Sequence, residues 1–417
     1  MRLVWLLAFC SLACSSPSSS GGGGGSASGG GIGVGGGSAT GGGASVGGGA
    51  AVGGGSATGG GAATGGGTAD AGTMTVVRFH YPAQGHALAI RGSLAPLNWN
   101  NGVVLTAGAD DTFTWADSSI TQTLELKPLL DDATWSRGPN YKVEPGQAID
   151  VYPHFTVQQG QWSRMWPTFH STTLNNDRGV WVYLPPTYVE NARSRFGVVY
   201  MHDGQNLFDP NAAFGGNPWW AQNAVDAAAE SGDFQEVIIV GPENTADRIP
   251  EYTPTADPQY GGGNGDAYLT MLVTELKPMV DATLRTIPDR EHTALVGSSL
   301  GGLISAYAGI HHADTYGLIG AMSPSSWWDN AVLATTLLPA TPASPRPIRV
   351  YVDSGDSGAS NDDVTETATV AQVYRNLGYS DGTTLKYLVQ AGGQHNEVYW
   401  AQRLPGALQF LVGPRVP

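Results

Sequence analysis

A serine between glycines stands where a short apolar run gives way to a helical pattern. The segment Gly297-Ser298-Ser299-Leu300-Gly301 follows Ala294-Leu295-Val296 and precedes an apolar run that begins at Leu303. A serine on a sharp strand-to-helix turn needs small neighbours, and the turn exposes its hydroxyl at the edge of the sheet. The same turn presents the Leu300 N–H, at a helix start, to a developing oxyanion. We therefore predict Ser299 as a nucleophile and Leu300 as an oxyanion donor.

A histidine near the C-terminus can supply the base that a serine hydroxyl needs. His395 lies in the glycine-rich segment 390–397, after the last predicted strand and within the final 25 residues. Imidazole is the side chain best suited to take a proton near neutral pH. We predict His395 as the general base that activates Ser299.

A carboxylate must hold the imidazole in the correct tautomer. The apolar run Ile348–Val352 ends in Asp353-Ser354-Gly355-Asp356, and Asp356, just beyond the strand, is the preferred candidate. Asp353, Asp362 and Asp363 remain alternatives, because residues 357–361 could form a loop that brings a later acid into place. The order serine, aspartate, histidine is that of α/β-hydrolases.

The second oxyanion donor should follow another strand. Val198–Met201 leads into His202-Asp203-Gly204-Gln205, a strand followed by a glycine turn. A backbone N–H in such a turn completes the oxyanion hole of this class. We predict Gln205 as the donor, and we expect His202 to shape the turn rather than to act as a base.

Tryptophan pairs provide candidates for substrate contacts. Trp219-Trp220 and Trp327-Trp328 could line a cleft, which suggests an aromatic or sugar-linked ester, although adjacent tryptophans often alternate between core and surface. We predict Trp220, Trp327 and Trp328 as substrate-binding residues. Arg248 and Tyr252, on a loop after the Val237–Val240 strand, could also contact substrate.

The elements that would position these residues alternate between strand and helix patterns from residue 165 to 417. Strands are predicted at Val180–Leu184, Gly197–Met201, Glu236–Val240, His292–Val296, Ile348–Val352 and Leu385–Val389, and helices at Trp219–Glu230 and Ala267–Thr286. Such alternation predicts an α/β fold, a doubly wound and mostly parallel sheet with helices on both faces.

Residues 73–160 have a different pattern. Val77-Phe79-Tyr81 and Leu88-Ile90 show the two-residue period of strands, separated by turn residues, which predicts a small all-β sandwich. The stretch 91–130 resembles both starch-binding-type sandwiches and the immunoglobulin-like domains that precede some esterases. Trp99, Trp135 and Tyr141 could form a platform for sugar rings or could be packing residues.

The N-terminus has the features of an export signal and a tether. Arg2 precedes the apolar run Leu3–Phe9, which is too short to span a bilayer, and Cys14 follows Ser11-Leu12-Ala13. Residues 1–14 resemble a bacterial lipoprotein signal, which implies lipidation of Cys14 and an outer-membrane location. In residues 15–72, Gly-Gly-Gly recurs at positions 35, 41, 47, 53, 59 and 65, a pattern typical of a flexible linker.

Composition excludes several functions. The 417 residues carry a formal charge of −15, which argues against a nucleic-acid partner. The two cysteines, Cys10 and Cys14, precede the predicted domains, so those domains have neither a disulfide nor a cysteine metal site. The adjacent His311-His312 cannot share one helix face as metal ligands would. We expect no metal.

Residues 165–417 resemble the esterase D and enterochelin-esterase group of α/β-hydrolases. The resemblance rests on Tyr200–Phe208, Gly297–Gly302, Met322–Trp328 and His395-Asn396-Glu397 with Trp400, spread in order over the domain. It implies a serine–acid–histidine triad, ester or thioester substrates and no cofactor. The sequence departs from the group at Gly358, where many members have the acid. Three alternatives to an esterase acting with water stay open: an acyltransferase, a siderophore esterase, and a carbohydrate-binding lipoprotein with an inert hydrolase domain.

Overall fold

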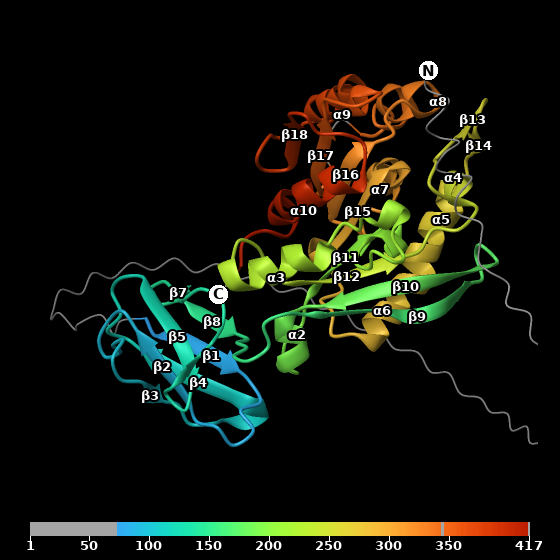
Figure 1. Cartoon of the computed structure of the whole chain (residues 1–417). Helices are drawn as coiled ribbons and strands as arrows, with labels where there is room; N and C mark the ends of the chain where they lie inside the picture. The colour runs from blue at the N-terminus through green and yellow to red at the C-terminus, as the bar shows by residue number, and fades with distance from the viewer. Residues whose placement is uncertain (1–72, 343–345, 416–417) are drawn as a thin grey trace, which may run out of the picture.

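The computed structural model describes residues 73–342 and 346–415. The predicted signal peptide 1–14 with Cys14, and the predicted linker 15–72, lie outside the described residues. Two folded parts follow one another along the chain, a β-rich part and a larger part with helices around a sheet (Figure 1).

The β-rich part contains β1 (Thr75–His80), β2 (Leu88–Gly92), β3 (Val103–Val104), β4 (Thr112–Asp117), β5 (Leu124–Leu130), β6 (Thr134–Trp135), β7 (Tyr141–Val143) and β8 (Ala148–Val151). They form one sheet in the order β4-β1-β8 and another in the order β3-β2-β5-β6, with β7 also paired to β5. Along β1, Val77 and Phe79 are buried while Val76, Arg78 and His80 are partly exposed, as expected for a strand with one face on a core.

The platform residues predicted in this part separate into two groups. Trp99 and Trp135 are 37% and 39% exposed, and their ring centroids lie 6.2 Å apart. Tyr141 is buried, and its hydroxyl accepts a hydrogen bond of 2.7 Å from Arg415. Tyr141 is therefore a packing residue, whereas the two tryptophans form an exposed aromatic pair.

The larger part contains β9 (Gln161–Ser171), β10 (Asn176–Leu184), β11 (Gly197–Met201), β12 (Val237–Pro242), β13 (Ala256–Asp257), β14 (Gly261–Gly262), β15 (Thr293–Ser299), β16 (Leu318–Pro324), β17 (Arg349–Gly355) and β18 (Leu385–Gln390). Its helices are α2 (Pro186–Glu190), α3 (Ala221–Ser231), α4 (Arg248–Glu251), α5 (Gly265–Met271), α6 (Lys277–Thr283), α7 (Leu300–His311), α8 (Trp328–Val332), α9 (Val364–Asn376) and α10 (Glu397–Val412).

Eight of these strands form one sheet in the order β18-β17-β16-β15-β11-β12-β10-β9. From β12 through β11 to β18 every neighbouring pair is parallel, while β10 pairs antiparallel with both β12 and β9. The α/β-hydrolase fold predicted from the sequence is confirmed, and the carboxyl ends of β11, β15, β16 and β17 meet along one edge.

Alternate residues of the central strands face two separate helix layers. Val198 and Tyr200 of β11 belong to a core shared with α5, α6, α7 and α9. Val199 and Met201 of the same strand belong to a second core shared with α3 and α10. The sheet is therefore covered on both faces, and its strands consist of nearly continuous apolar runs.

The β-rich part is attached to the larger part by an acidic residue of α2. The Glu190 carboxylate accepts backbone hydrogen bonds from Phe155, Thr156 and Val157 at 2.7, 2.8 and 2.8 Å. It also accepts one of 2.9 Å from the Tyr81 hydroxyl. Burial alone would raise the pKa of Glu190, but these donors outweigh it and the pKa lies below its usual value. Glu190 thus joins both parts and the segment between them.

Within residues 73–342 and 346–415, none of the helices combines the length and the apolar character that crossing a bilayer requires.

Candidate active site

Ser299 sits at the junction between β15 and α7, as the glycine-flanked motif predicts. Its backbone has φ 59° and ψ −125°, a positive-φ conformation that costs energy for a residue with a side chain. The strained turn leaves the Ser299 side chain partly exposed while Ser298 before it and Leu300 after it are buried. Leu300 is the first residue of α7. Its N–H is one of the first N–H groups of the helix, which have no hydrogen-bond acceptor within the helix.

The glycines around Ser299 make room for a buried histidine. A Cβ atom at Gly297 would lie 2.6 Å from Cδ2 of His202, and one at Gly301 would lie 3.2 Å from its Cβ. Nδ1 of His202 is 2.9 Å from the Tyr268 hydroxyl, and burial lowers the pKa of His202 to about 3. His202 therefore stays neutral and packs the turn, which is the role that the sequence predicts for it.

The carboxylate that meets His395 is Asp362, one of the alternatives, and not Asp356. Nδ1 of His395 lies 2.6 Å from Oδ1 of Asp362, which is fully buried. Asp356 instead accepts a 2.7 Å hydrogen bond from the Gly392 N–H, in the loop that precedes His395. The choice of Asp356 is therefore corrected. A short helical turn at Asn361–Asp363, in which all three residues have positive φ, directs Asp362 back toward the strand ends.

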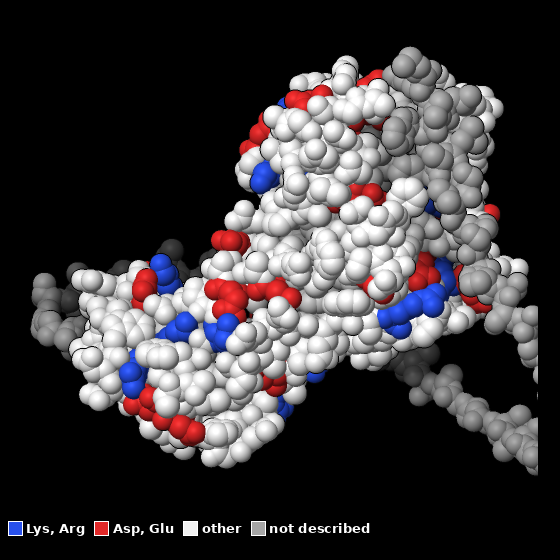
Figure 2. Space-filling model, in the orientation of Figure 1, with Lys and Arg blue, Asp and Glu red and all other residues white. Residues whose placement is uncertain are grey.

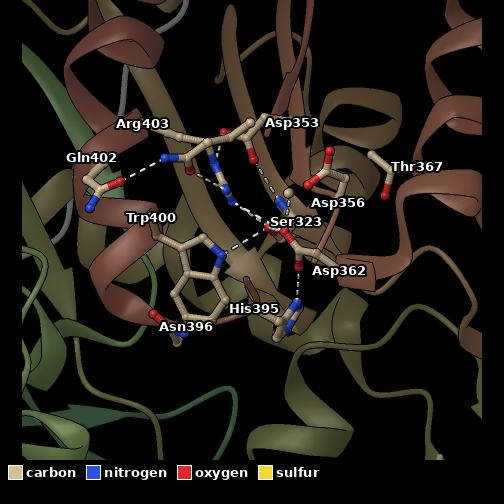
Figure 3. Close-up of polar contacts among 12 residues, drawn as sticks. Ser323, Asp353, Asp356, Asp362, Thr367, His395, Asn396, Trp400, Gln402 and Arg403 are labelled. Atoms are coloured by element: carbon tan, nitrogen blue, oxygen red, sulfur yellow. Dashed lines mark hydrogen bonds and ion pairs between the residues drawn. The ribbon is translucent and has the colours of Figure 1, made fainter. Parts of the chain in front are cut away.

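Asp362 belongs to a buried polar network centred on Ser323, the next-to-last residue of β16 (Figure 3). The Ser323 hydroxyl donates to Oδ2 of Asp362 at 2.6 Å. It accepts hydrogen bonds from the Trp400 indole N–H at 3.0 Å and from Arg403 at 2.6 Å. Because one hydroxyl has a single proton and two lone pairs, Ser323 uses its full capacity here.

The remaining alternatives are also occupied elsewhere. Asp353 is buried, accepts a hydrogen bond from the Ser323 N–H at 2.9 Å and pairs with Arg403 at 2.9 Å. Asp363 precedes α9 as its N-terminal cap position. Burial would raise the pKa of Asp362, but hydrogen bonds from His395, Ser323 and the Gly355 N–H outweigh it and lower that pKa. Asp362 is therefore the ionised partner of the His395 ring.

A second serine of the same segment connects this network to Ser299. The Ser325 N–H donates to the Ser299 carbonyl at 3.0 Å, and the two hydroxyl oxygens lie 3.3 Å apart. Ser323 and Ser325 thus link the Asp362–His395 pair and Ser299 to one stretch of chain at the end of β16. The Ser299 hydroxyl contacts Ser325 here, and its pairing with His395 stays a prediction.

The turn after β11 lies directly beside the Ser299 turn. The His202 N–H donates to the Val296 carbonyl at 3.0 Å, and Gln205 lies in the helical turn Gly204–Asn206 that follows. A Cβ atom at Gly204 would come 2.0 Å from the Gly241 carbonyl oxygen, so only glycine fits. The predicted donors Gln205 and Leu300 therefore follow neighbouring parallel strands, β11 and β15.

Arg248 supports this turn. It forms two hydrogen bonds of 2.8 Å with the Asp203 carboxylate, and Asn244 adds a third of 2.6 Å. Burial opposes the charge of both partners, yet attraction between them lowers the pKa of Asp203 and raises that of Arg248. The guanidinium predicted to bind substrate is thus already paired.

The predicted substrate-binding tryptophans lie in three different environments. Trp328 is fully buried, and its indole N–H donates to the Thr255 carbonyl at 3.0 Å, so the prediction that it binds substrate is wrong. Trp327 is partly buried and packs edge-on against Tyr260, with ring centroids 5.7 Å apart. Trp220 is 44% exposed at the start of α3.

Sequence reasoning missed several residues of the site. Ser323 and Arg403 hold Asp362, and Glu397 is buried at the start of α10, two residues after His395. Burial raises the pKa of Glu397 from 4.5 to about 7; nearby Asp203 adds to this rise, and His395 and Arg248 oppose it. Ser323 was missed because the strand that carries it, β16, was not predicted. The Gly-Ala-Met-Ser sequence in this strand lacks the branched residues typical of strands. Among the residues that the structure describes, no group of three histidine, cysteine or acidic side chains could hold a metal ion.

The chain is similar in sequence to a known family and to known proteins. The family model described as "Putative esterase" matches residues 171–411, more than half of the chain. Uncharacterized protein YbbA of Bacillus subtilis is 26% identical over 246 residues, which cover 56% of this chain and 91% of that protein. Iron(III) salmochelin esterase of Escherichia coli is 32% identical over 253 residues, and the match covers 57% of this chain but 54% of that protein.

Two solved structures extend the comparison. A ferulic acid esterase is 24% identical with a TM-score of 0.45, and the match covers 61% of this chain and 99% of that one. The enterobactin esterase FES of Shigella flexneri is 15% identical with a TM-score of 0.46, covering 80% of this chain and 92% of that one. The expected resemblance to the esterase D and enterochelin-esterase group is confirmed by the family match and the relatives. This chain belongs to the Esterase family and is a carboxylic ester hydrolase.

Proposed function

We propose that this hydrolase is a serine esterase with Ser299 as nucleophile, His395 as general base and Asp362 as the acid of the triad. The observation that carries the proposal is the 2.6 Å contact between Nδ1 of His395 and the buried Asp362 carboxylate. A carboxylate on Nδ1 leaves Nε2 free of a proton, and Nε2 is the atom that must accept the serine proton. The strained backbone of Ser299 is a second support.

The reaction follows from these roles. His395 takes the Ser299 proton as the serine oxygen attacks the ester carbonyl, and the Leu300 and Gln205 N–H groups stabilise the tetrahedral oxyanion. His395 then returns the proton to the leaving alcohol, which departs and leaves an acyl-enzyme. Water loses a proton to His395, attacks the acyl carbonyl, and Ser299 recovers its proton as the acid is released.

Above its raised pKa, Glu397 favours an uncharged acyl group over an anionic one. Asp203 is balanced by Arg248, whereas Glu397 is buried near His395 and its pKa is raised to about 7. Relatives include a salmochelin esterase, and similar structures include a ferulic acid esterase, so a ferric tricatechol ester and feruloyl esters are the substrates to test first.

We propose export and lipid anchoring as a separate feature. The support is the sequence alone: an apolar N-terminal run that ends at Cys14, followed by a glycine-rich stretch. Cys14→Ser should release the esterase from the outer-membrane fraction into the soluble envelope fraction. A protein that remains membrane-bound after this substitution would contradict the anchor.

A substrate panel tests the catalytic proposal. Wild type and Ser299→Ala are compared on p-nitrophenyl acetate, feruloylated sugars and a ferric tricatechol ester. We expect Ser299→Ala to lose about 10³-fold or more in kcat on every ester that the wild type cleaves. Unchanged turnover in the variant would contradict the triad, and a sugar or alcohol acceptor that diverts the acyl group from water would identify a transferase.

A further inference from the structure

A surface groove of about 520 Å³ runs between α3 and α10. Ala227 of α3 and Ala401 and Gly406 of α10 line it, and their short side chains leave the facing sides of the two helices apart. Both helices begin at the carboxyl edge of the sheet: α10 starts two residues after His395, and the start of α3 is bonded to the turn after β11. One end of the groove therefore opens at the catalytic edge.

An exposed tryptophan marks this catalytic end. Trp220 precedes α3 with φ 51° and ψ 40°, a left-handed conformation that is unusual for a bulky residue. Its neighbour Trp219 is buried against Trp400, with ring centroids 5.7 Å apart, and Trp400 packs edge-on to His395 at 5.0 Å. The strained backbone keeps one tryptophan in the core and presents the other to the groove.

The polar side chains along the groove are mostly carboxamides. Asn217, Asn223, Gln402 and Gln409 contribute amides, and Asp233 is the only ionisable residue among those that line it. An aromatic face with uncharged donors and acceptors suits a polyhydroxylated, uncharged ligand better than an anionic one. A buried tunnel would be expected for a long acyl chain, whereas this groove is open and combines apolar and aromatic residues with four amides.

The end of α3 contacts the β-rich part close in sequence to its aromatic pair. Arg137 pairs with Glu230, near the end of α3, at 2.5 Å. Trp135 is the last residue of β6, and Arg137 follows it by two residues, so the aromatic pair lies close in the chain to the contact with Glu230. Trp99 lies beside Trp135 at an angle of 43°, and the Arg91 guanidinium lies 5.3 Å from the Trp135 ring centre.

The Arg91 side chain is fixed in place. Its Nε donates to Asp132 at 2.8 Å, and a second nitrogen donates to the Trp99 carbonyl at 3.2 Å. These contacts of Arg91 hold the rings of Trp99 and Trp135 in fixed positions. Much of the surface on the face in Figure 2 carries neither sign of charge, in keeping with a neutral ligand.

We propose that one neutral polysaccharide chain binds along this route, from the Trp99–Trp135 pair through the α3–α10 groove to the catalytic edge. The esters that Ser299 cleaves would be substituents of that chain. The inference deepens the proposed function, because it names the alcohol side of the ester as a glycan and assigns the β-rich part a share in holding it.

Binding is tested without catalysis. The full chain carrying Ser299→Ala is run in affinity electrophoresis through gels that contain arabinoxylan, mixed-linkage β-glucan or starch. We expect at least one polymer to retard it, and the added changes Trp99→Ala, Trp135→Ala or Trp220→Ala to weaken retardation about five- to tenfold. Tyr152→Ala is the matched control. It removes an exposed aromatic side chain directly after β8, away from the proposed route, and should leave retardation unchanged. Migration unaffected by all three polymers would overturn the proposal.

Kinetics test the groove itself. Ala227→Leu places a larger side chain in the groove. The position is exposed and helical, and leucine favours helices, so the fold should tolerate the change. We expect the ratio of kcat/KM on a feruloylated form of the retarding polymer to kcat/KM on p-nitrophenyl acetate to fall about tenfold. Tyr152→Ala should keep the ratio. An unchanged ratio in Ala227→Leu, or a selective loss on p-nitrophenyl palmitate, would overturn the glycan assignment and leave the esterase standing.

Failure of the proposed function has a different signature. If wild type and Ser299→Ala cleave p-nitrophenyl acetate equally, the triad is wrong, while retardation by a polymer and its loss in Trp99→Ala would still support the binding route.

Discussion

Asp362 is the residue whose surroundings constrain the chemistry most. Its two carboxylate oxygens accept hydrogen bonds from the His395 ring, the Ser323 hydroxyl and the Gly355 N–H, and its side chain is fully buried. A carboxylate held by that many donors stays ionised and cannot rotate away from the imidazole. The acid of a triad must both hold the correct imidazole tautomer and stabilise the imidazolium, and a fixed, ionised carboxylate suits both roles.

Replacing this carboxylate by its amide should cripple catalysis. Asp362→Asn should lower kcat on p-nitrophenyl acetate by about 10³–10⁴-fold, because an amide NH₂ facing Nδ1 favours the wrong histidine tautomer. Asp356→Asn is the matched control: it keeps the oxygen that accepts from Gly392, so kcat should stay within about threefold. A larger loss in Asp356→Asn than in Asp362→Asn would reinstate Asp356.

Glu397 should make stability depend on pH. Its pKa is about 7 in the fold against an ordinary 4.5, so the folded state holds a proton that the unfolded chain releases as pH rises through this window. Stability is therefore lost as pH rises from about 4.5 to 7, by about 3 kcal/mol for this shift. Glu397→Gln removes that loss, which urea unfolding at pH 4, 6 and 8 would measure. Parallel pH curves for the two proteins would contradict the raised pKa.

Ser299 and His395 could be proposed as nucleophile and base from the sequence because each candidate depends on local chain features. Ser299 stands in a glycine-flanked strand-to-helix turn, and His395 follows the last strand. The acid could not be named with certainty, since Asp356 and Asp362 differ only in how the intervening loop folds. The positive φ values of Asn361, Asp362 and Asp363, which turn that loop back, have no clear sequence signature.

At the scale of elements, neighbouring turns position the site by packing closely. The turn after β15 leaves room for His202 from the turn after β11, and both turns depend on glycines. Most strands could be predicted from their apolar runs, because buried parallel strands carry them. The strand β16 was missed, since its Gly320-Ala321-Met322 sequence has small and flexible residues in place of branched ones. That omission also hid Ser323.

A methyl group at Gly297 should disrupt this packing. Its Cβ would lie 2.6 Å from His202 and 2.8 Å from the Gly301 backbone, so Gly297→Ala should cost about 1–3 kcal/mol and displace Ser299. Gly406→Ala in α10 is the control, because no heavy atom lies within 4 Å of its Cβ and alanine favours helices. Thermal unfolding and kcat would be compared. Equal stability of the two variants would show that the turn tolerates the added atom.

At the scale of the whole molecule, the two folded parts are joined by specific polar contacts. Glu190 holds the segment 155–157 and Tyr81, and Asn191 donates to the carbonyls of His80 and Pro153 at 2.8 and 2.9 Å. These contacts fix the Trp99–Trp135 face relative to α3. Both parts and their order could be predicted from the sequence. The contacts of Glu190 and Asn191 with the β-rich part could not, because contacts between segments a hundred residues apart produce no periodic pattern in the sequence.

Removing the Glu190 carboxylate should loosen this junction. Glu190→Ala leaves the N–H groups of Phe155, Thr156 and Val157 without their acceptor, at a cost of about 3–5 kcal/mol. We expect calorimetry to resolve two transitions and proteases to cut within 152–160. Arg193→Ala breaks only the exposed pair with Asp111 and should cost about 0–1 kcal/mol. Identical melting of both variants would contradict the assigned role of Glu190.

The most direct test of the catalytic account is covalent labelling with a fluorophosphonate, which reacts with activated serines. Mass spectrometry of the digested wild-type protein should find the adduct on the peptide that contains Ser299, formed much more slowly in Asp362→Asn and absent from Ser299→Ala. An adduct on a different serine, or none at all in a folded protein that still hydrolyses esters, would contradict Ser299 as the nucleophile.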